Sequence, residues 1–250
     1  MKIQLLYFLE RVLLVPCLPF LYFSGKKARG KIKKLPPQSD YQYIPSLSKE
    51  NTLLIIGEST VAGVGASSPQ TTFASNIDLL SFNGFEIHNI GKNGLRAGKL
   101  MGLLMGNPVA KEMPFTSAIV MIGANDCFKL THPKKFRKDL EMFLQFLIME
   151  KGVNKIIIPM VPPVHVFPAI PGLLRFFMRI HRYMLTSEIT SLSQKIIPLH
   201  FDVSKQDFTG EFFAADGIHP SDLGYSMMAK SVFAHFNFIE KKKEAAKPPL

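Results

Sequence analysis

Two short segments, far apart in the chain, carry the residue types of a nucleophilic hydrolase. Gly57-Glu58-Ser59-Thr60 follows an apolar run, and Asp216-Gly217-Ile218-His219-Pro220 lies near the C-terminus. A carboxylate three residues before a histidine, in a turn marked by glycine and proline, can bind the far ring nitrogen of that histidine. The near nitrogen is then free to take a proton from a hydroxyl group. The pattern predicts Ser59 as nucleophile, His219 as base and Asp216 as the orienting acid.

Two segments between them offer hydrogen-bond donors. Asn89-Ile90-Gly91-Lys92-Asn93-Gly94 and Gly123-Ala124-Asn125-Asp126 each end an apolar run. An oxyanion hole needs backbone N–H groups or side-chain amides, and Gly94 and Asn125 supply one of each. Together with the N–H of Ser59, they form the predicted oxyanion hole. Each residue alone could be a helix cap or part of an Asx turn, so the prediction depends on all four segments occurring in this order.

The four segments resemble those of the SGNH hydrolases, also called GDSL esterases and lipases. The resemblance covers roughly residues 51–237 and implies a serine esterase that acts on acyl esters without a cofactor. Two positions depart from the family pattern. Glu58 stands where the family usually has Asp, and Ala124 stands where a second glycine is common. Neither departure touches a residue that performs chemistry.

Apolar runs alternate with amphipathic stretches from Asn51 onward, which predicts buried strands separated by helices. This alternation is typical of a parallel sheet covered on both faces, in which ligands collect at the carboxyl ends of the strands. Ser59, Gly94 and Asn125 follow the first three strands, so we expect them at one edge of the sheet. The predicted strands are 52–56, 85–90, 117–122, 155–160 and 196–201, and the predicted helices are 72–82, 95–105, 134–150, 173–193 and 221–236.

The serine segment argues against one common hydrolase architecture. Gly57-Glu58-Ser59-Thr60-Val61 lacks the second glycine of the Gly-x-Ser-x-Gly elbow of α/β-hydrolases. The resemblance instead implies a flavodoxin-like α/β fold, a three-layer α/β/α sandwich with a five-stranded parallel sheet.

The net charge of +11 is concentrated at the two ends of the chain. Residues 1–36 hold eight lysines and arginines against one glutamate, and residues 241–250 hold four lysines against one glutamate. The central part is nearly neutral, so we expect no nucleic-acid partner. Basic ends beside apolar sequence favour an anionic membrane surface instead.

Cysteine and histidine usage gives no sign of a disulfide or a metal site. Cys17 and Cys127 lie in unrelated segments, and nothing marks Cys127 as an activated nucleophile. The seven histidines show no metal-binding spacing. We therefore predict no metal and no cofactor. Asp126, which follows Asn125, is expected to have a structural role and not a catalytic one.

Residues 3–23 are almost continuously apolar and approach the length of a spanning helix. Glu10 and Arg11 in the middle of the segment, together with Pro16 and Pro19, argue against a simple span. The internal charges and the lack of a small-residue cleavage site also disfavour a cleaved secretory signal.

We therefore expect residues 1–24 to be a membrane-anchoring or interfacial segment, held on the cytoplasmic leaflet by the basic run that follows. A secreted or periplasmic location is less favoured, and Pro16 disfavours a lipoprotein signal at Cys17. Packing of the segment on the domain as an ordinary helix is the alternative. The remaining predicted parts are a basic linker (25–50), the hydrolase domain (51–240) and a basic tail (241–250).

Residues 159–180 follow the fourth predicted strand and are rich in proline and apolar side chains, which suits a wall or lid for an acyl chain. Val164, Phe167 and Arg175 are the candidate substrate-binding residues, and Arg175 begins a basic stripe that faces either lipid phosphate or solvent. We expect acyl esters, including lipids or lysophospholipids, as substrates. Acyl transfer by the same site and a catalytically silent membrane-bound binding module are the alternatives.

Overall fold

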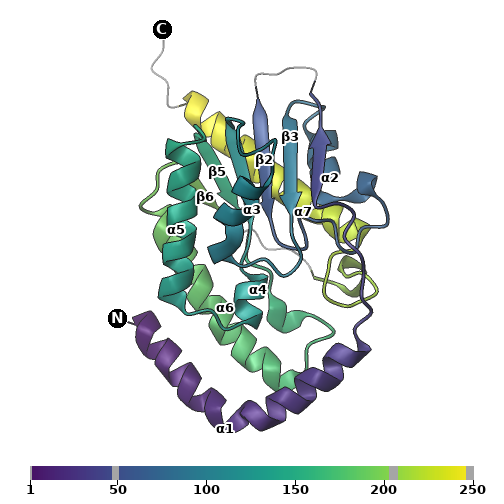
Figure 1. Cartoon of the computed structure of the whole chain (residues 1–250), viewed down its shortest axis with the longest axis vertical. Coiled ribbons are helices and arrows are strands. Elements are labelled where there is room, and N and C mark those ends of the chain that lie inside the picture. Colours follow the sequence, from purple (N-terminus) through teal and green to yellow (C-terminus); the bar gives the residue numbers. More distant parts are fainter. Residues whose placement is uncertain (1, 47–50, 203–207, 246–250) are drawn as a thin grey trace.

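The centre of the computed structural model is a six-stranded sheet (Figure 1), and the structure describes residues 2–46, 51–202 and 208–245. The order across the sheet is β1-β3-β2-β4-β5-β6, which without β1 is the flavodoxin-like order. β1 pairs antiparallel with β3, and the other strands are parallel. The strands are β1 (Tyr41–Ile44), β2 (Thr52–Gly57), β3 (Glu86–Gly91), β4 (Ser117–Met121), β5 (Lys155–Ile158) and β6 (Leu199–Phe201).

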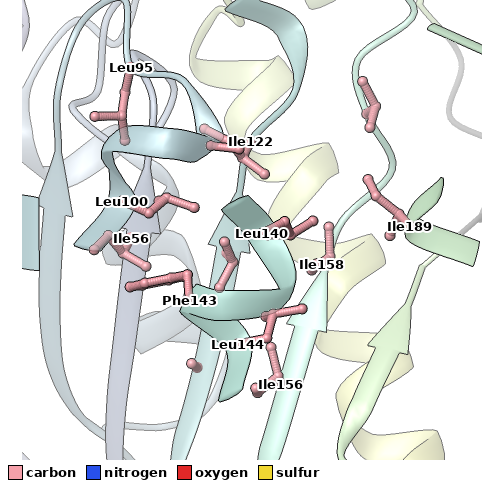
Figure 2. Packing of buried hydrophobic residues seen from close by; sticks show 14 of the residues in the cluster. Ile56, Leu95, Leu100, Ile122, Leu140, Phe143, Leu144, Ile156, Ile158 and Ile189 are labelled. Atoms are coloured by element: carbon pink, nitrogen blue, oxygen red, sulfur yellow. The ribbon is translucent and has the colours of Figure 1, made fainter. Parts of the chain in front are cut away.

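Helices cover both faces of the sheet because alternate strand residues point to opposite sides. Leu54 and Ile56 of β2 pack toward one face, and Leu53 and Ile55 pack toward the other. Figure 2 shows the first face, where apolar side chains of α5 lie against β2 and β5. The first face is covered by α3 (Leu100–Gly106), α5 (Pro133–Met149) and α6 (Gly172–Ser193), and the second by α2 (Phe73–Leu80) and α7 (Asp222–Ala245).

The predicted fold is confirmed, with one strand more than expected. β1 lies in the segment predicted as a basic linker (25–50). The strand is only four residues long, and no long apolar run marks it in the sequence. It forms because β3 offers an unpaired edge. The chain already joins the domain at Gln38, whose backbone N–H donates to the Ala62 carbonyl (2.9 Å) and whose side chain donates to the Ala66 carbonyl (2.6 Å).

The N-terminal segment forms α1 (Lys2–Lys31), which contains Pro16 and Pro19 and bends beneath the domain (Figure 1). Proline lacks an N–H and clashes with the preceding turn, which explains the bend. Within the described part of the chain, α1 is the one helix long and apolar enough to cross a membrane, over residues 2–28 with a mean hydropathy of 1.6. α1 packs on α6. Packing on the domain was the alternative to a membrane-anchoring segment in the sequence analysis.

Short elements sit where strands end. α4 (Ala124–Phe128) follows β4 directly and is too short to show a helical period in the sequence. Because β3 and β4 flank β2 on opposite sides, the segments after these strands converge around the carboxyl end of β2, the usual ligand position in such sheets. Four 3-10 turns complete the described elements: Pro69–Thr71, Ala97–Lys99, Val164–Val166 and Gly210–Phe212.

Candidate active site

Ser59 lies in a tight loop at the carboxyl end of β2. β2 can end so close to β4 only because Gly57 lacks a side chain, since a Cβ there would lie 2.1 Å from the Met121 carbonyl oxygen. The N–H of Glu58 still donates to that carbonyl (3.1 Å), and the chain then turns so that the Ser59 carbonyl accepts from the N–H of Val64 (3.0 Å). The Ser59 side chain is thereby held at the sheet edge.

Asp216 and His219 lie in the turn before α7. The Asp216 Oδ1 atom accepts the backbone N–H groups of Ile218 (2.9 Å) and His219 (3.0 Å), which fixes the carboxylate within the turn. Its Oδ2 atom lies 2.5 Å from His219 Nδ1. His219 Nε2 lies 2.9 Å from Ser59 Oγ. The structure thus places the three residues of the predicted triad in one hydrogen-bonded series.

The serine loop and the histidine turn pack directly on each other. Gly65 has a φ of +97°, and a Cβ there would lie 2.4 Å from the Pro220 carbonyl oxygen and 3.1 Å from His219 Cβ. The buried Tyr225 hydroxyl of α7 donates to the Val64 carbonyl (2.7 Å). These contacts set the distance between Ser59 and His219.

Asn125 is held by Glu58. One Glu58 oxygen accepts the N–H of Ala124 (3.0 Å), and the other accepts both the N–H of Asn125 (3.0 Å) and its side-chain amide (2.6 Å). An asparagine amide carries two N–H groups, so one stays available for a ligand. Glu58, one of the two residues that depart from the usual family pattern, therefore orients the first turn of α4 and the side-chain amide of Asn125.

Burial raises the pKa of Glu58 to about 7, although the hydrogen bonds from Asn125 and Ala124 oppose that rise. Asp216 behaves in the opposite way. Burial alone raises its pKa, but hydrogen bonds from the side chain and backbone of His219 and from the backbone of Ile218 outweigh burial and hold the pKa below its usual value. The Asp216 carboxylate therefore stays charged beside the imidazole.

Gly94 follows β3 with φ +73°, a conformation that glycine adopts readily, and it lines the same cavity as Ser59 and Asn125. Asp126 joins the two segments that supply the predicted oxyanion donors. Its buried carboxylate accepts the N–H of Ala97 (2.9 Å) in the loop after Gly94. This contact agrees with the structural role expected for Asp126.

A cavity of about 410 Å³ opens beside these groups, and its polar end contains Ser59, His219, Gly94 and Asn125. That volume is within the usual range of small-molecule sites. The rest of the wall is largely apolar and is built mainly by Phe128, Pro159, Met160, Pro162, Phe167, Phe208, Phe212, Ile218, Met228 and Val232.

The three predicted substrate-binding residues are placed differently. Phe167 lines the cavity, whereas Val164 is fully buried in the core beside it. Arg175 donates to the carbonyls of Ile170 (2.8 Å) and Phe167 (3.2 Å) and so holds the loop that carries Phe167. Arg182 donates in the same way to the Val161 carbonyl (2.8 Å), a role that the sequence stripe did not reveal.

Cys127 is fully buried and free, and burial raises the pKa of its thiol, which does not favour a nucleophile. Among the residues that the structure describes, no group of three or more His, Cys, Asp or Glu side chains is arranged to hold a metal ion.

A flavodoxin-like sheet whose carboxyl edge joins a serine, a histidine and an aspartate beside an apolar cavity defines the architecture of an ester hydrolase. Residues 55–227 match the GDSL-like lipase/acylhydrolase family, and the chain belongs to that family. The resemblance drawn from the four sequence segments is therefore confirmed. A comparison with curated proteins found no matching sequence.

Several solved structures share the fold. The lipase Lip_vut3 from a goat rumen metagenome is 17% identical with a TM-score of 0.58, over 74% of this chain and 96% of that one. TesA gives 17% identity and a TM-score of 0.58 over 74% and 97%. A carbohydrate acetylesterase family member from Sinorhizobium meliloti gives 16% and 0.56 over 75% and 98%. At these identities the likeness shows the fold.

Proposed function

We propose that the chain is a serine esterase that cleaves acyl esters through Ser59, His219 and Asp216. The observation that carries the proposal is the series of contacts from Asp216 Oδ2 to His219 Nδ1 (2.5 Å) and from His219 Nε2 to Ser59 Oγ (2.9 Å) at the polar end of an apolar cavity.

The chemistry follows from these contacts. Asp216 holds the proton on Nδ1 of His219, so Nε2 accepts the Ser59 proton as Ser59 attacks the ester carbonyl. The developing oxyanion is stabilised by the N–H groups of Ser59 and Gly94 and by the Asn125 amide. His219 then protonates the leaving alkoxide, and water cleaves the acyl-enzyme by the reverse steps.

The apolar wall of the cavity supports an acyl chain longer than acetyl. Phe128, Phe167 and Phe212 come from three separate segments of the chain. An acyl chain packed against them would lose its contact with water, and each Å² of apolar surface removed from water contributes roughly 25 cal/mol of favourable free energy. We therefore assign lipids and lysophospholipids as the substrate class, with the acyl chain against this wall and the ester at Ser59.

A membrane location fits this substrate class. The apolar α1 and the basic residues around it support attachment to an anionic leaflet, and the excess of positive charge favours the cytoplasmic side.

The test is hydrolysis of p-nitrophenyl esters from acetyl to palmitoyl by the purified full chain, with Ser59→Ala and the matched control Ser187→Ala on the exposed side of α6. Activity should rise from acetyl toward longer chains, disappear in Ser59→Ala and persist in Ser187→Ala. Retained activity in Ser59→Ala would overturn the mechanism. Ester products formed with an added alcohol in place of free acid would assign acyl transfer to the same site, and a folded but inactive protein would indicate a binding module.

A further inference from the structure

α1 is fastened to the catalytic domain along one stripe. Its buried residues, Glu10, Leu14 and Leu21, are four and seven positions apart and contact α6 and its neighbours. Leu14 and Leu21 form a small apolar cluster with Phe177 of α6. Spacing of three and four residues places such side chains on one face of a helix. α1 is therefore packed lengthwise on the domain.

A buried polar contact lies in the middle of this stripe. Glu10 Oε2 lies 2.9 Å from His181 Nδ1, and His181 Nε2 lies 3.0 Å from the Thr131 carbonyl oxygen. The side chains of Glu10 and His181 are fully buried. Both ring nitrogens of His181 therefore lie within hydrogen-bonding distance of an oxygen atom, one on α1 and one at Thr131. Separating α1 from α6 would break this contact, and moving Glu10 into hydrocarbon without its partner would be costly.

The opposite face of α1 is apolar and exposed. Leu5, Val12 and Phe23 lie on this face at helical spacing and are 60%, 53% and 68% exposed, and Phe8 and Val15 beside them are also exposed. Single exposed apolar side chains are common, but a continuous apolar face of this length marks a surface that contacts a membrane or another protein.

The charges around this face select its partner. Lys2 precedes the apolar stretch, and Lys26, Lys27 and Lys31 follow it on the same helix, all of them exposed. Residues 1–36 carry eight lysines and arginines against Glu10 alone. The pairing of Glu10 with His181 removes its charge from the exposed face. An apolar face between clusters of lysines matches an anionic lipid surface, with the acyl region under the helix and the headgroups at its ends.

We propose that α1 lies flat in the surface of an anionic membrane leaflet, clamped to α6 through Glu10 and His181, and does not cross the bilayer. A spanning helix would have to leave α6 and carry an unpaired Glu10 into hydrocarbon. The proposal is independent of catalysis and extends the membrane attachment proposed above to a defined face and orientation.

This arrangement places the active-site turn near the lipid. The C-terminal end of α1, with Lys27 and Lys31, lines a cavity of about 440 Å³ together with Pro168, Ile170 and Asp216. Ala169 in the same loop donates its N–H to the Gly217 carbonyl (3.3 Å), next to Asp216. The lipid-bound helix therefore ends against the loop and the turn that build one side of the active site.

The experiment uses single tryptophans, because the chain contains none. Leu5→Trp, Val12→Trp and Phe23→Trp are made in the full chain with Ser59→Ala, so that no turnover alters the vesicles. Each variant is mixed with phosphatidylglycerol–phosphatidylcholine vesicles that carry bromine at a shallow or a deep acyl position. Phe82→Trp, at an exposed loop position on α2's side of the domain, is the matched control.

For a helix lying flat, all three tryptophans should shift to shorter emission wavelength and show the same ratio of shallow to deep quenching, while Phe82→Trp shows neither effect. In a spanning helix Val12 would lie about 10 Å or more deeper than Leu5, at 1.5 Å per residue, so stronger deep quenching at Val12 alone would overturn the proposal.

Two further outcomes would also overturn it. One is equal binding to pure phosphatidylcholine vesicles, because the lysines would then play no part. The other is a dimer in solution whose tryptophans are buried without lipid, because a second copy would then cover the face. A variant that fails to fold is recognised by its circular dichroism, and Leu9→Trp on the same helix replaces it.

Discussion

The Glu58 carboxylate accepts the side-chain amide of Asn125 at 2.6 Å while it also accepts the backbone N–H groups of Ala124 and Asn125. The residue before the nucleophile therefore orients the amide that we assign to the oxyanion hole, across the gap between β2 and β4. Glu58 has one methylene more than the aspartate usual in the family, and the extra length reaches α4.

Glu58→Ala should lower kcat strongly with a smaller effect on KM, because the amide loses its anchor while the acyl cavity is unchanged. Loss of one oxyanion donor typically costs about 10²–10³ in rate, which is the upper bound expected here. Steady-state kinetics on a p-nitrophenyl ester measure the effect. Glu58→Gln, which keeps one acceptor oxygen, should lose less, and an unchanged kcat in Glu58→Ala would show that Asn125 is oriented by something else.

Glu58 should also give the folding stability a specific pH dependence. Its pKa rises from 4.5 to about 7 on folding, so the folded state binds the proton more tightly than the unfolded state. The resulting stabilisation is complete below the unfolded pKa and is lost as the pH rises through about 7. The free energy of unfolding of the wild type minus that of Glu58→Gln should fall by as much as about 3 kcal/mol between pH 4 and pH 8. Urea denaturation across this range checks the sign, and a difference that grows with pH would contradict it.

Gly65→Ala should damage the triad more than the fold. A methyl group there would lie 2.4 Å from the Pro220 carbonyl oxygen, which pushes the His219 turn away from Ser59. Misplacement by about 1 Å can cost about 10² in rate. Gly152→Ala is the matched control because Gly152 also has a positive φ (+74°) but no atom within 4 Å of the added methyl. The measurements are kcat and the thermal unfolding midpoint of both variants. Equal losses of activity in Gly65→Ala and Gly152→Ala would show that backbone strain, and not the contact with Pro220, causes the effect.

The Glu10 and His181 pair predicts strong coupling between two residues far apart in the sequence. His181→Leu should destabilise the docked α1 by about 3–5 kcal/mol, because Glu10 is left buried without its partner, and Glu10→Leu should do the same to His181. The double variant should recover much of the loss. Trypsin cleavage at the exposed Arg11 reports undocking of α1, and additive effects of the two substitutions would argue against the clamp.

Much of the fold and of the candidate site was predictable because the relevant signals are local. The apolar runs that became β2, β3, β4 and β5 end within two residues of the predicted ends, and the segments after them contain Ser59, Gly94 and Asn125. The spacing from Asp216 to His219 fits a single turn, so their contact could be anticipated from the sequence alone.

The missed features depend on contacts between distant residues. β1 is stabilised by its pairing with the edge of β3, and the sequence of its four residues does not indicate this pairing. Arg182 belongs to the basic stripe that begins at Arg175, and its role was missed because helical spacing shows which residues share a face but not which carbonyls lie opposite them. Glu10 looked like an obstacle to membrane insertion because its partner, His181, lies on another helix far along the chain.

The attachment of Gln38 to Ala62 and Ala66 has a mechanical consequence. Only six residues separate the end of α1 from Gln38, a span of at most about 25 Å, and Gln38 is hydrogen-bonded to the loop that begins at Ser59. The chain therefore has no long tether on which the domain could rotate freely above a bound α1. Because α1 is also held on α6 through Glu10 and His181, the domain would move over a membrane as one rigid body with this helix, and any shift of α1 relative to the domain would be passed through Gln38 to the loop that carries Ser59.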